Sequence, residues 1–222
     1  MILTMPADPA VLRRSLNAVA MYQAGYFTAA QALEAGYSYQ SQKYHVDHGN
    51  WDRVDRGLFR LPGWPARDED RYVFWRLWSR GLAVVSHQSA LVIYDLGDVN
   101  PTRLHLTVPL GFRAKDAAVV IHRAVLAPED IEDRDGYQIT SVQRTIFDVA
   151  SGDMPQEQLD VAVTDAVKRG LVARRRLRHR ADEFGSRAAL RIERALTALE
   201  SGSLCPISTP HPELSVRRLR RG

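Results

Sequence analysis

Three short helical segments, each opened by a capping residue and closed by a glycine, fill the first fifty residues and restrict the fold more than any other feature of this chain. The opening residues are Asp8, Thr28 and Ser38, whose side chains can accept hydrogen bonds from the N–H groups at a helix start. The closing residues are Gly25, Gly36 and Gly49, which suit the left-handed backbone that ends many helices. Apolar spacing predicts a helix that starts at Pro9 and two more over residues 29–35 and 39–48.

A tight turn around Gly36 joins the second and third helices, which is the arrangement of a helix-turn-helix. After Gly49 the pattern changes to a period of two over residues 51–55, and residues 58–61 follow an Arg56-Gly57 pair, so a small hairpin is predicted. A helix-turn-helix followed by a hairpin indicates a winged helix-turn-helix domain over residues 1–65. Residues 62–65, Pro-Gly-Trp-Pro, break regular structure and predict a boundary before a second domain over residues 68–222.

The second domain carries both strand and helix patterns. Strands are predicted over residues 83–85, 103–108 and 118–122, which are rich in β-branched and aliphatic side chains. Helices are predicted over residues 70–80, 142–150, 155–169, 174–184 and 186–200, and a further one, capped by Ser86, runs to Tyr94. Beyond Tyr137 the pattern is helical. We therefore expect an α+β protein: an N-terminal winged helix-turn-helix followed by a mixed α/β domain with a mainly helical C-terminal half.

Composition places the chain among globular proteins and gives it a weakly basic charge. Hydrophobic residues make up 45% and charged residues 25% of its 222 residues, and the formal net charge is +4. This charge favours a polyanionic partner without identifying one. The single cysteine, Cys205, excludes an internal disulfide framework. The first residues lack the order of a secretory signal, and no apolar run is long enough for a membrane span, so we expect a cytoplasmic protein.

The second helix of a helix-turn-helix enters the major groove, and its exposed side chains read the base edges. Over residues 39–48, Gln42 and Val46 are expected to face inward. The DNA contacts expected from the helices and their caps are Thr28, Ser38, Tyr39, Gln40, Lys43 and Tyr44. Of these, Gln40 can pair with adenine in bidentate fashion and Lys43 can donate to guanine.

The hairpin would supply Arg53, Arg56 and Arg60 to the phosphate backbone. Acidic residues nearby keep the local positive charge modest. This favours a homodimer in which each subunit binds one half-site of double-stranded DNA. A winged helix used for protein contacts is the alternative. A second basic run comprises Lys168, Arg169, Arg174, Arg175, Arg176, Arg178 and Arg180. It is either a solvated helical face or a contact for flanking DNA or an acidic partner.

Two other groups of residues have types that could carry chemistry. His45 and His48 have a spacing that could hold a metal, but no third ligand lies nearby in the sequence, so an exposed or DNA-proximal position is expected. The group Ser86, His87 and Ser89 lacks the strained elbow of a nucleophilic serine, and a helix cap explains Ser86 better. No glycine-rich nucleotide loop is present. We expect no cofactor, no metal and no enzymatic activity.

The segments GYFTAAQALEAGYS, GNW and RGLFRL resemble the N-terminal domain of the AbiEi-type antitoxins of type IV toxin-antitoxin systems. The segments SHQSALVIYDL, LHLTVP, VVIHRA and TSVQRTIFDVA resemble the C-terminal region of the same family, so the resemblance extends to about residue 200. It implies a cytoplasmic autorepressor that binds inverted repeats in its own promoter. Through its second domain, such a protein counteracts a nucleotidyltransferase toxin, by direct contact or indirectly.

The chain departs from that family at position 42, which is usually aliphatic there and is Gln42 here. This departure leaves open whether Gln42 packs inward or faces DNA. Two other function classes also stay open. One is a transcriptional regulator whose second domain senses a ligand or dimerises, and the other is a nuclease-associated DNA-binding protein that acts with a separately encoded catalytic partner.

Overall fold

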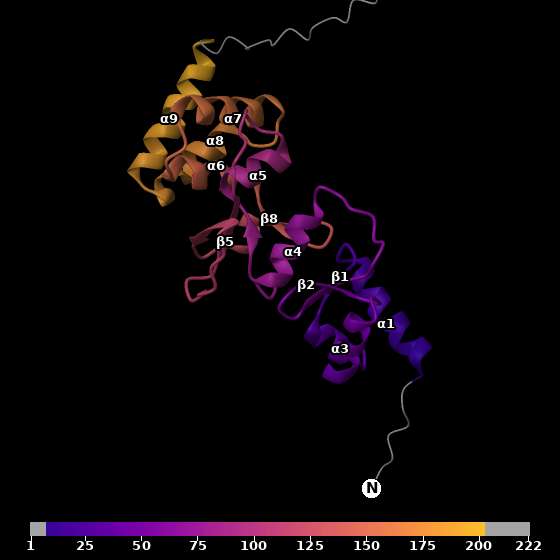
Figure 1. The fold of residues 1–222 in the computed structure, drawn as a ribbon. Coiled ribbons are helices and arrows are strands. Elements are labelled where there is room, and N and C mark those ends of the chain that lie inside the picture. Colours follow the sequence, from indigo (N-terminus) through magenta and orange to yellow (C-terminus); the bar gives the residue numbers. More distant parts are fainter. Residues whose placement is uncertain (1–7, 203–222) are drawn as a thin grey trace, which may run out of the picture.

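A computed structural model describes residues 8–202 and shows an α+β fold with two small sheets (Figure 1). Cys205 and the basic run at residues 217–222 lie outside the described residues. Within the described part of the chain, no helix is long and apolar enough to cross a membrane. We call residues 8–61 the N-terminal unit and residues 70–202 the C-terminal unit.

The N-terminal unit contains three helices and three strands in the order α1, β1, α2, α3, β2, β3. Their bounds are α1 Pro9–Met21, β1 Tyr26–Thr28, α2 Ala29–Glu34, α3 Tyr39–Asp47, β2 Asp52–Asp55 and β3 Leu58–Arg60. The strands form an antiparallel sheet in the order β1-β3-β2. The predicted helices and hairpin are confirmed, whereas the three-residue strand β1 was not predicted.

The three predicted capping residues all cap their helices. Asp8 accepts a hydrogen bond from the Ala10 N–H, and Ser38 accepts one from the Ser41 N–H. Thr28 forms a reciprocal capping box with Gln31. Behind these helices, aromatic rings fill a small separate core made of Leu16, Ala20, Phe27, Ala32, Tyr37, Trp51 and Phe59. The N-terminal unit therefore has a hydrophobic core of its own.

The C-terminal unit combines a five-stranded sheet with a cluster of helices at one end (Figure 1). Its first half contains α4 Asp70–Trp78, β4 Val84–Val85, α5 His87–Tyr94, β5 Leu104–Val108 and β6 Val119–Arg123. Its second half contains η1 Pro128–Asp130, β7 Ile131–Asp133, β8 Gln138–Thr140, α6 Val142–Ser151, α7 Gln156–Lys168, α8 Arg174–Arg180, η2 Ala181–Phe184 and α9 Ser186–Glu200. The sheet order is β6-β5-β4-β8-β7, with parallel pairs β5·β6 and β4·β8.

Most sequence predictions for this unit are confirmed to within two residues, and three need correction. The segment after Tyr137 first forms β8, and β7 was also missed. The helix predicted over residues 174–184 changes at Ala181 into the 3₁₀ helix η2. Helix α5 begins directly after Ser86, but the Ser86 side chain does not cap it. Its hydroxyl oxygen instead accepts a hydrogen bond from Thr107 at 2.8 Å.

The irregular residues 62–69 join two units that also pack against each other. The indole of Trp64 covers Gly25 so closely that a Cβ there would lie 2.5 Å from Trp64 Cγ. Tyr26 belongs to the larger core of the C-terminal unit and meets the ring of Phe74 edge to face at 6.1 Å. The predicted break at residues 62–65 is thus an irregular connection, with contacts between the two units around it.

Candidate nucleic-acid interface

The exposed face of α3 carries the residues expected to read bases. Tyr39 is 69% exposed and Tyr44 is 54% exposed, and Gln40 is also exposed. The Lys43 ammonium is exposed and pairs with Asp47, one helical turn later, at 2.5 Å. An exposed i,i+4 pair of this kind stabilises a helix only slightly, so Lys43 can exchange Asp47 for a base or a phosphate at little cost.

Gln42 faces inward, which decides between its two predicted orientations. Its side chain is 3% exposed, and its Nε2 donates to the backbone oxygen of Ala29 at 3.1 Å and to that of Tyr37 at 3.0 Å. An aliphatic residue at this position would pack equally well but could not satisfy these two carbonyls. In this chain the amide of Gln42 therefore joins α3 to the start of α2 and to the turn before α3.

The tip of the hairpin is tied to the start of α2. Gly57 has a φ of 70°, which glycine tolerates, and its carbonyl accepts a hydrogen bond from the Ala29 N–H at 2.9 Å. Arg53 and Arg56 are exposed on this hairpin. Thr28 and Ser38 use their hydroxyl oxygens as cap acceptors, and each keeps a hydroxyl proton to donate.

Arg60, the third expected hairpin cation, lies elsewhere. It stands at the end of β3 away from the tip, and its guanidinium forms a partly buried ion pair with Asp70. Its Nε donates to the Ala24 carbonyl at 3.2 Å, and its charge lies 4.6 Å from the centre of the Tyr26 ring. Because these contacts hold the side chain between the two units, we do not include Arg60 in the candidate interface.

A groove of about 740 Å³ borders this surface. The hairpin tip and the start of α2 form one side of the groove, and the end of α4 forms the other side. Its polar lining includes Thr28, Gln31, Tyr39, Arg56, Arg76 and Arg80. The groove brings together the start of α3, the hairpin tip and a segment of the C-terminal unit, which no sequence pattern had connected.

His45 in α3 and His48, which directly follows α3, both stack on aromatic rings. The His45 ring stacks on Trp51 with centroids 4.7 Å apart, and burial lowers the pKa of His45. The His48 ring stacks on Tyr44 at 3.9 Å. Over residues 8–202 the structure contains no group of three histidine, cysteine or acidic side chains that could hold a metal ion.

Three of the seven cations of the second basic run form ion pairs with neighbouring carboxylates. Arg178 pairs with Glu193 and Glu200, Arg174 lies 3.8 Å from Glu200, and Arg180 pairs with Asp130 and Glu183. Arg169 donates to the carbonyls of Tyr94 and Asp95 at the end of α5. Among the described residues, the exposed cations of this run without an ion pair are Lys168, Arg169, Arg175 and Arg176.

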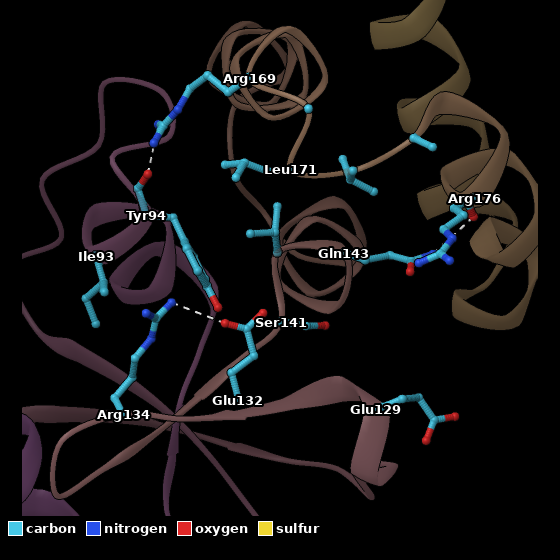
Figure 2. A pocket seen from close by; sticks show the side chains of 14 residues that line it. Ile93, Tyr94, Glu129, Glu132, Arg134, Ser141, Gln143, Arg169, Leu171 and Arg176 are labelled. Carbon is cyan, nitrogen blue, oxygen red and sulfur yellow. Dashed lines mark hydrogen bonds and ion pairs between the residues drawn. The ribbon is translucent and has the colours of Figure 1, made fainter.

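Arg169 and Arg176 also line a cavity of about 710 Å³ inside the C-terminal unit (Figure 2). Its other polar lining residues are Tyr94, Glu129, Glu132, Arg134, Ser141 and Gln143. Arg134 forms an ion pair with Glu132 at 3.2 Å. Nearby, the Tyr94 hydroxyl donates to the Thr140 carbonyl at 3.0 Å. Two carboxylates and three guanidinium groups line the cavity, so groups of both charges are available to a ligand.

A cluster of three histidines was missed by sequence reasoning. His87 stacks on His122 with ring centres 3.5 Å apart, and His105 Nδ1 lies 3.0 Å from His122 Nε2. Burial and the neighbouring imidazoles lower the pKa of His87 to about 2 and that of His105 to about 4, and burial lowers the pKa of His122. His87 has a left-handed φ of 52°. The three histidines lie in three separate sequence segments, SHQSA, LHLTVP and VVIHRA. Only the parallel pairing of β5 and β6 brings His105 and His122 together.

Behind the cluster, Arg144 of α6 forms buried ion pairs with Asp130 and Asp148. Burial raises the pKa of Asp148 to about 6, although Arg144 opposes this rise. Asp148 Oδ2 has no hydrogen-bond partner within residues 8–202. The ion pair with Asp130 joins α6 to η1, and the contact of the Arg144 guanidinium with the Phe184 ring joins α6 to η2. The segment TSVQRTIFDVA therefore has a structural role, because it connects these elements.

Comparison with solved structures shows a similarity of fold. The fold is similar to that in the crystal structure of the RV2827C protein from Mycobacterium tuberculosis, with a TM-score of 0.56 and 18% sequence identity over 89% of this chain and 79% of that one. At this identity the likeness concerns the fold alone. No family model and no curated protein matches the sequence.

Proposed function

We propose that the N-terminal unit is a winged helix-turn-helix domain that binds operator DNA. The order of its elements and the four-residue connection Ala35 to Ser38 between α2 and α3, which contains Gly36, support this proposal. The observation that carries it is that Tyr39, at the start of α3, and Arg56, at the hairpin tip, line the same groove. A reading helix and a basic hairpin on one side of a small domain are what simultaneous contact with bases and phosphates requires.

A retardation assay with duplex DNA from the chain's own promoter region tests the proposal. The double variant Gln40→Ala with Lys43→Ala removes the two side chains proposed to read bases, and we expect it to lose specific retardation. The matched control is Arg187→Ala, an exposed cation on α9 far from α3 in Figure 1, which should bind as the wild type does. Unchanged specific retardation by the double variant would reject α3 as the recognition helix.

We further propose that the chain is an AbiEi-type antitoxin that represses its own operon and counteracts a nucleotidyltransferase toxin. The support is the resemblance of segments in both units, together with the proposed DNA-binding domain. Co-expression with a nucleotidyltransferase encoded beside it should restore growth of cells that the enzyme alone arrests. Continued arrest at matched protein levels would reject the antitoxin role while leaving DNA binding unaffected.

A regulator whose C-terminal unit senses a ligand is the second candidate. The observation that favours it is the cavity in Figure 2, whose volume of about 710 Å³ lies within the range of small-molecule sites. If a small molecule from the cell binds there, the variant Leu171→Trp, which adds bulk to the cavity wall, should differ from the wild type in operator affinity when both are measured in cell extract. The two purified proteins should bind the operator equally well. An antitoxin without a ligand should show the same affinity in both conditions.

A further inference from the structure

We propose that the C-terminal unit takes part in DNA binding through Arg80, at the end of α4, which would contact a phosphate beside the one bound by Arg56. This inference rests on the proposed DNA binding of the N-terminal unit and extends that surface to a residue outside it. Arg80 lies beyond the predicted domain boundary at residues 62–65, so the sequence had assigned it no role.

The turn after α4 holds Arg80 in a defined position. Ser79 is 1% exposed; its hydroxyl donates to the Arg76 carbonyl at 2.8 Å and accepts from the Ala83 N–H at 2.8 Å. The backbone N–H of Arg80 donates to the carbonyl oxygen of Leu77 at 2.9 Å. Arg80 itself has a left-handed φ of 60°, a conformation that costs a side-chain residue about 1 kcal/mol. The chain thus keeps an arginine at a position where glycine would be less strained.

The side chain of Arg80 is exposed and forms no ion pair within the part of the chain that the structure describes. It lines the groove together with Arg56 and Tyr39. A third arginine of the groove, Arg76, is held by the side-chain oxygen of Gln138 at 2.7 Å. The groove's only carboxylate, among residues 8–202, is Asp55, which accepts from the Arg56 backbone N–H at 2.6 Å. The groove is therefore positively charged and suits a phosphate backbone.

Contacts between the two units fix the position of α4 beside the hairpin. The ion pair of Arg60 with Asp70 lies at the start of α4, and Tyr26 packs against Phe74 in its middle. A Cβ at Gly136 would lie 2.8 Å from the Tyr22 carbonyl oxygen, so the chain before β8 also lies against the end of α1. Because two of these contacts hold α4 against β1 and β3 and the third lies beside it, Arg80 would meet a duplex together with Arg56 and α3.

Double-stranded DNA fits this groove better than an acidic protein. The groove borders the start of α3, where Tyr39 and Gln40 are exposed, so a duplex that places α3 in its major groove brings its backbone to Arg56 and then to Arg80. A phosphate contact of this kind adds affinity without sequence preference and makes binding more dependent on salt.

The full-length variant Arg80→Gly tests the inference, because glycine relieves the left-handed strain while it removes the charge, so that unfolding cannot explain a loss. Binding to a fluorescent duplex from the chain's own promoter region is measured over a range of salt concentrations, and a scrambled duplex is measured in parallel. We expect the slope of log affinity against log salt to fall by about one and the affinity at 0.15 M salt to fall about fivefold on both duplexes. Arg80→Lys keeps the charge and should keep the slope.

The outcomes separate the inference from the proposal on which it rests. If the wild type binds the promoter duplex and Arg80→Gly has the same slope as the wild type and the Arg187→Ala control, the contribution of Arg80 is wrong while DNA binding stands. A loss confined to the promoter duplex would also overturn it, because a phosphate contact carries no sequence preference. If the wild type binds neither duplex, the proposed function fails and the inference fails with it.

Discussion

At the scale of single residues, the amide of Gln42 is the polar link between the two helices of the proposed helix-turn-helix. It satisfies the carbonyls of Ala29 and Tyr37 from a buried position. Gln42→Ala should lower the free energy of unfolding by about 1–3 kcal/mol, because both carbonyls lose their donor. Urea unfolding measures this loss, and the variant should keep its preference among DNA sequences under conditions where it is folded. Unchanged stability with an altered sequence preference would show that Gln42 reads DNA.

Arg60 and Arg56 lie on one hairpin, yet the structure separates their roles. Arg60→Ala leaves Asp70 buried without its partner and should lower the free energy of unfolding by about 3 kcal/mol. Arg56→Ala should leave stability within about 0.5 kcal/mol and reduce the salt dependence of DNA binding. Urea unfolding and salt titration of both variants check this. An Arg60→Ala protein as stable as Arg56→Ala would contradict the structural role of Arg60.

The sequence could not distinguish these two arginines. An alternating pattern tells which residues share a face of a strand, but not what covers that face. The partner of Arg60, Asp70, comes from another unit, and only the packing of α4 on β1 brings it near. For the same reason the inward position of Gln42 depends on two carbonyls that become neighbours only when α2 and α3 pack.

At the scale of elements, helices α2 and α3, each with a capping residue and a glycine stop, were predicted closely, and so was α9, whose apolar residues keep a regular helical spacing. The strands β1, β7 and β8 were missed, and each has three residues. A strand this short shows no period of its own, so it is predicted only where a turn or a run of aliphatic residues marks it, as for β3 and β4. The pairing of β1 is decided by a partner distant in the sequence, since Tyr26 lies opposite Arg60. The histidine cluster was missed for the same reason, because β5 and β6 place His105 beside His122 only after pairing.

The histidine cluster makes stability depend on pH. The folded-state pKa values of His87 and His105 lie below the unfolded value of about 6.5, so the unfolded chain takes up protons first as the pH falls. We therefore expect stability to be fully present above pH 6.5 and to decrease toward pH 5, by about 2 kcal/mol for His87 and by less for His105, which is less buried. Asp148 opposes this by about 1 kcal/mol, because its raised pKa lets the folded state bind a proton in the same range.

Urea midpoints measured from pH 7.5 to pH 5 test this dependence. His87→Asn removes one of the titrating groups and suits the left-handed backbone at this position, so its midpoint should change less with pH than that of the wild type. Asp148→Asn should make the decrease steeper than in the wild type. A wild-type midpoint that rises toward pH 5 would mean that the cluster is protonated in the folded protein.

At the scale of the whole molecule, the two units have separate cores and a shared boundary. A fragment of residues 1–67 keeps the aromatic core of the N-terminal unit but loses Phe74 and Asp70, the partners of Tyr26 and Arg60. We expect it to fold with a lower urea midpoint than the full chain and to bind operator weakly. A fragment of residues 68–222 should counteract the toxin without repressing the promoter.

Circular dichroism and growth assays at matched expression check these fragments. If the fragment of residues 68–222 is folded and fails to restore growth, the antitoxin action cannot belong to the C-terminal unit alone. If the fragment of residues 1–67 binds operator as tightly as the full chain, with the same salt dependence, the C-terminal unit adds nothing to the interface. Arg60→Ala in the full chain is the control for loss of contact between the units.

The central claim is that α3 and the hairpin bind operator DNA, and footprinting of the promoter region by the full chain tests it most directly. We predict two protected half-sites in inverted orientation, centred about one helical turn of DNA, or a multiple of it, apart. Protection should disappear with Gln40→Ala combined with Lys43→Ala and persist with Arg187→Ala. Protection that survives the double variant, or a full chain that protects no site in the promoter at concentrations where it retards the duplex, would contradict the claim.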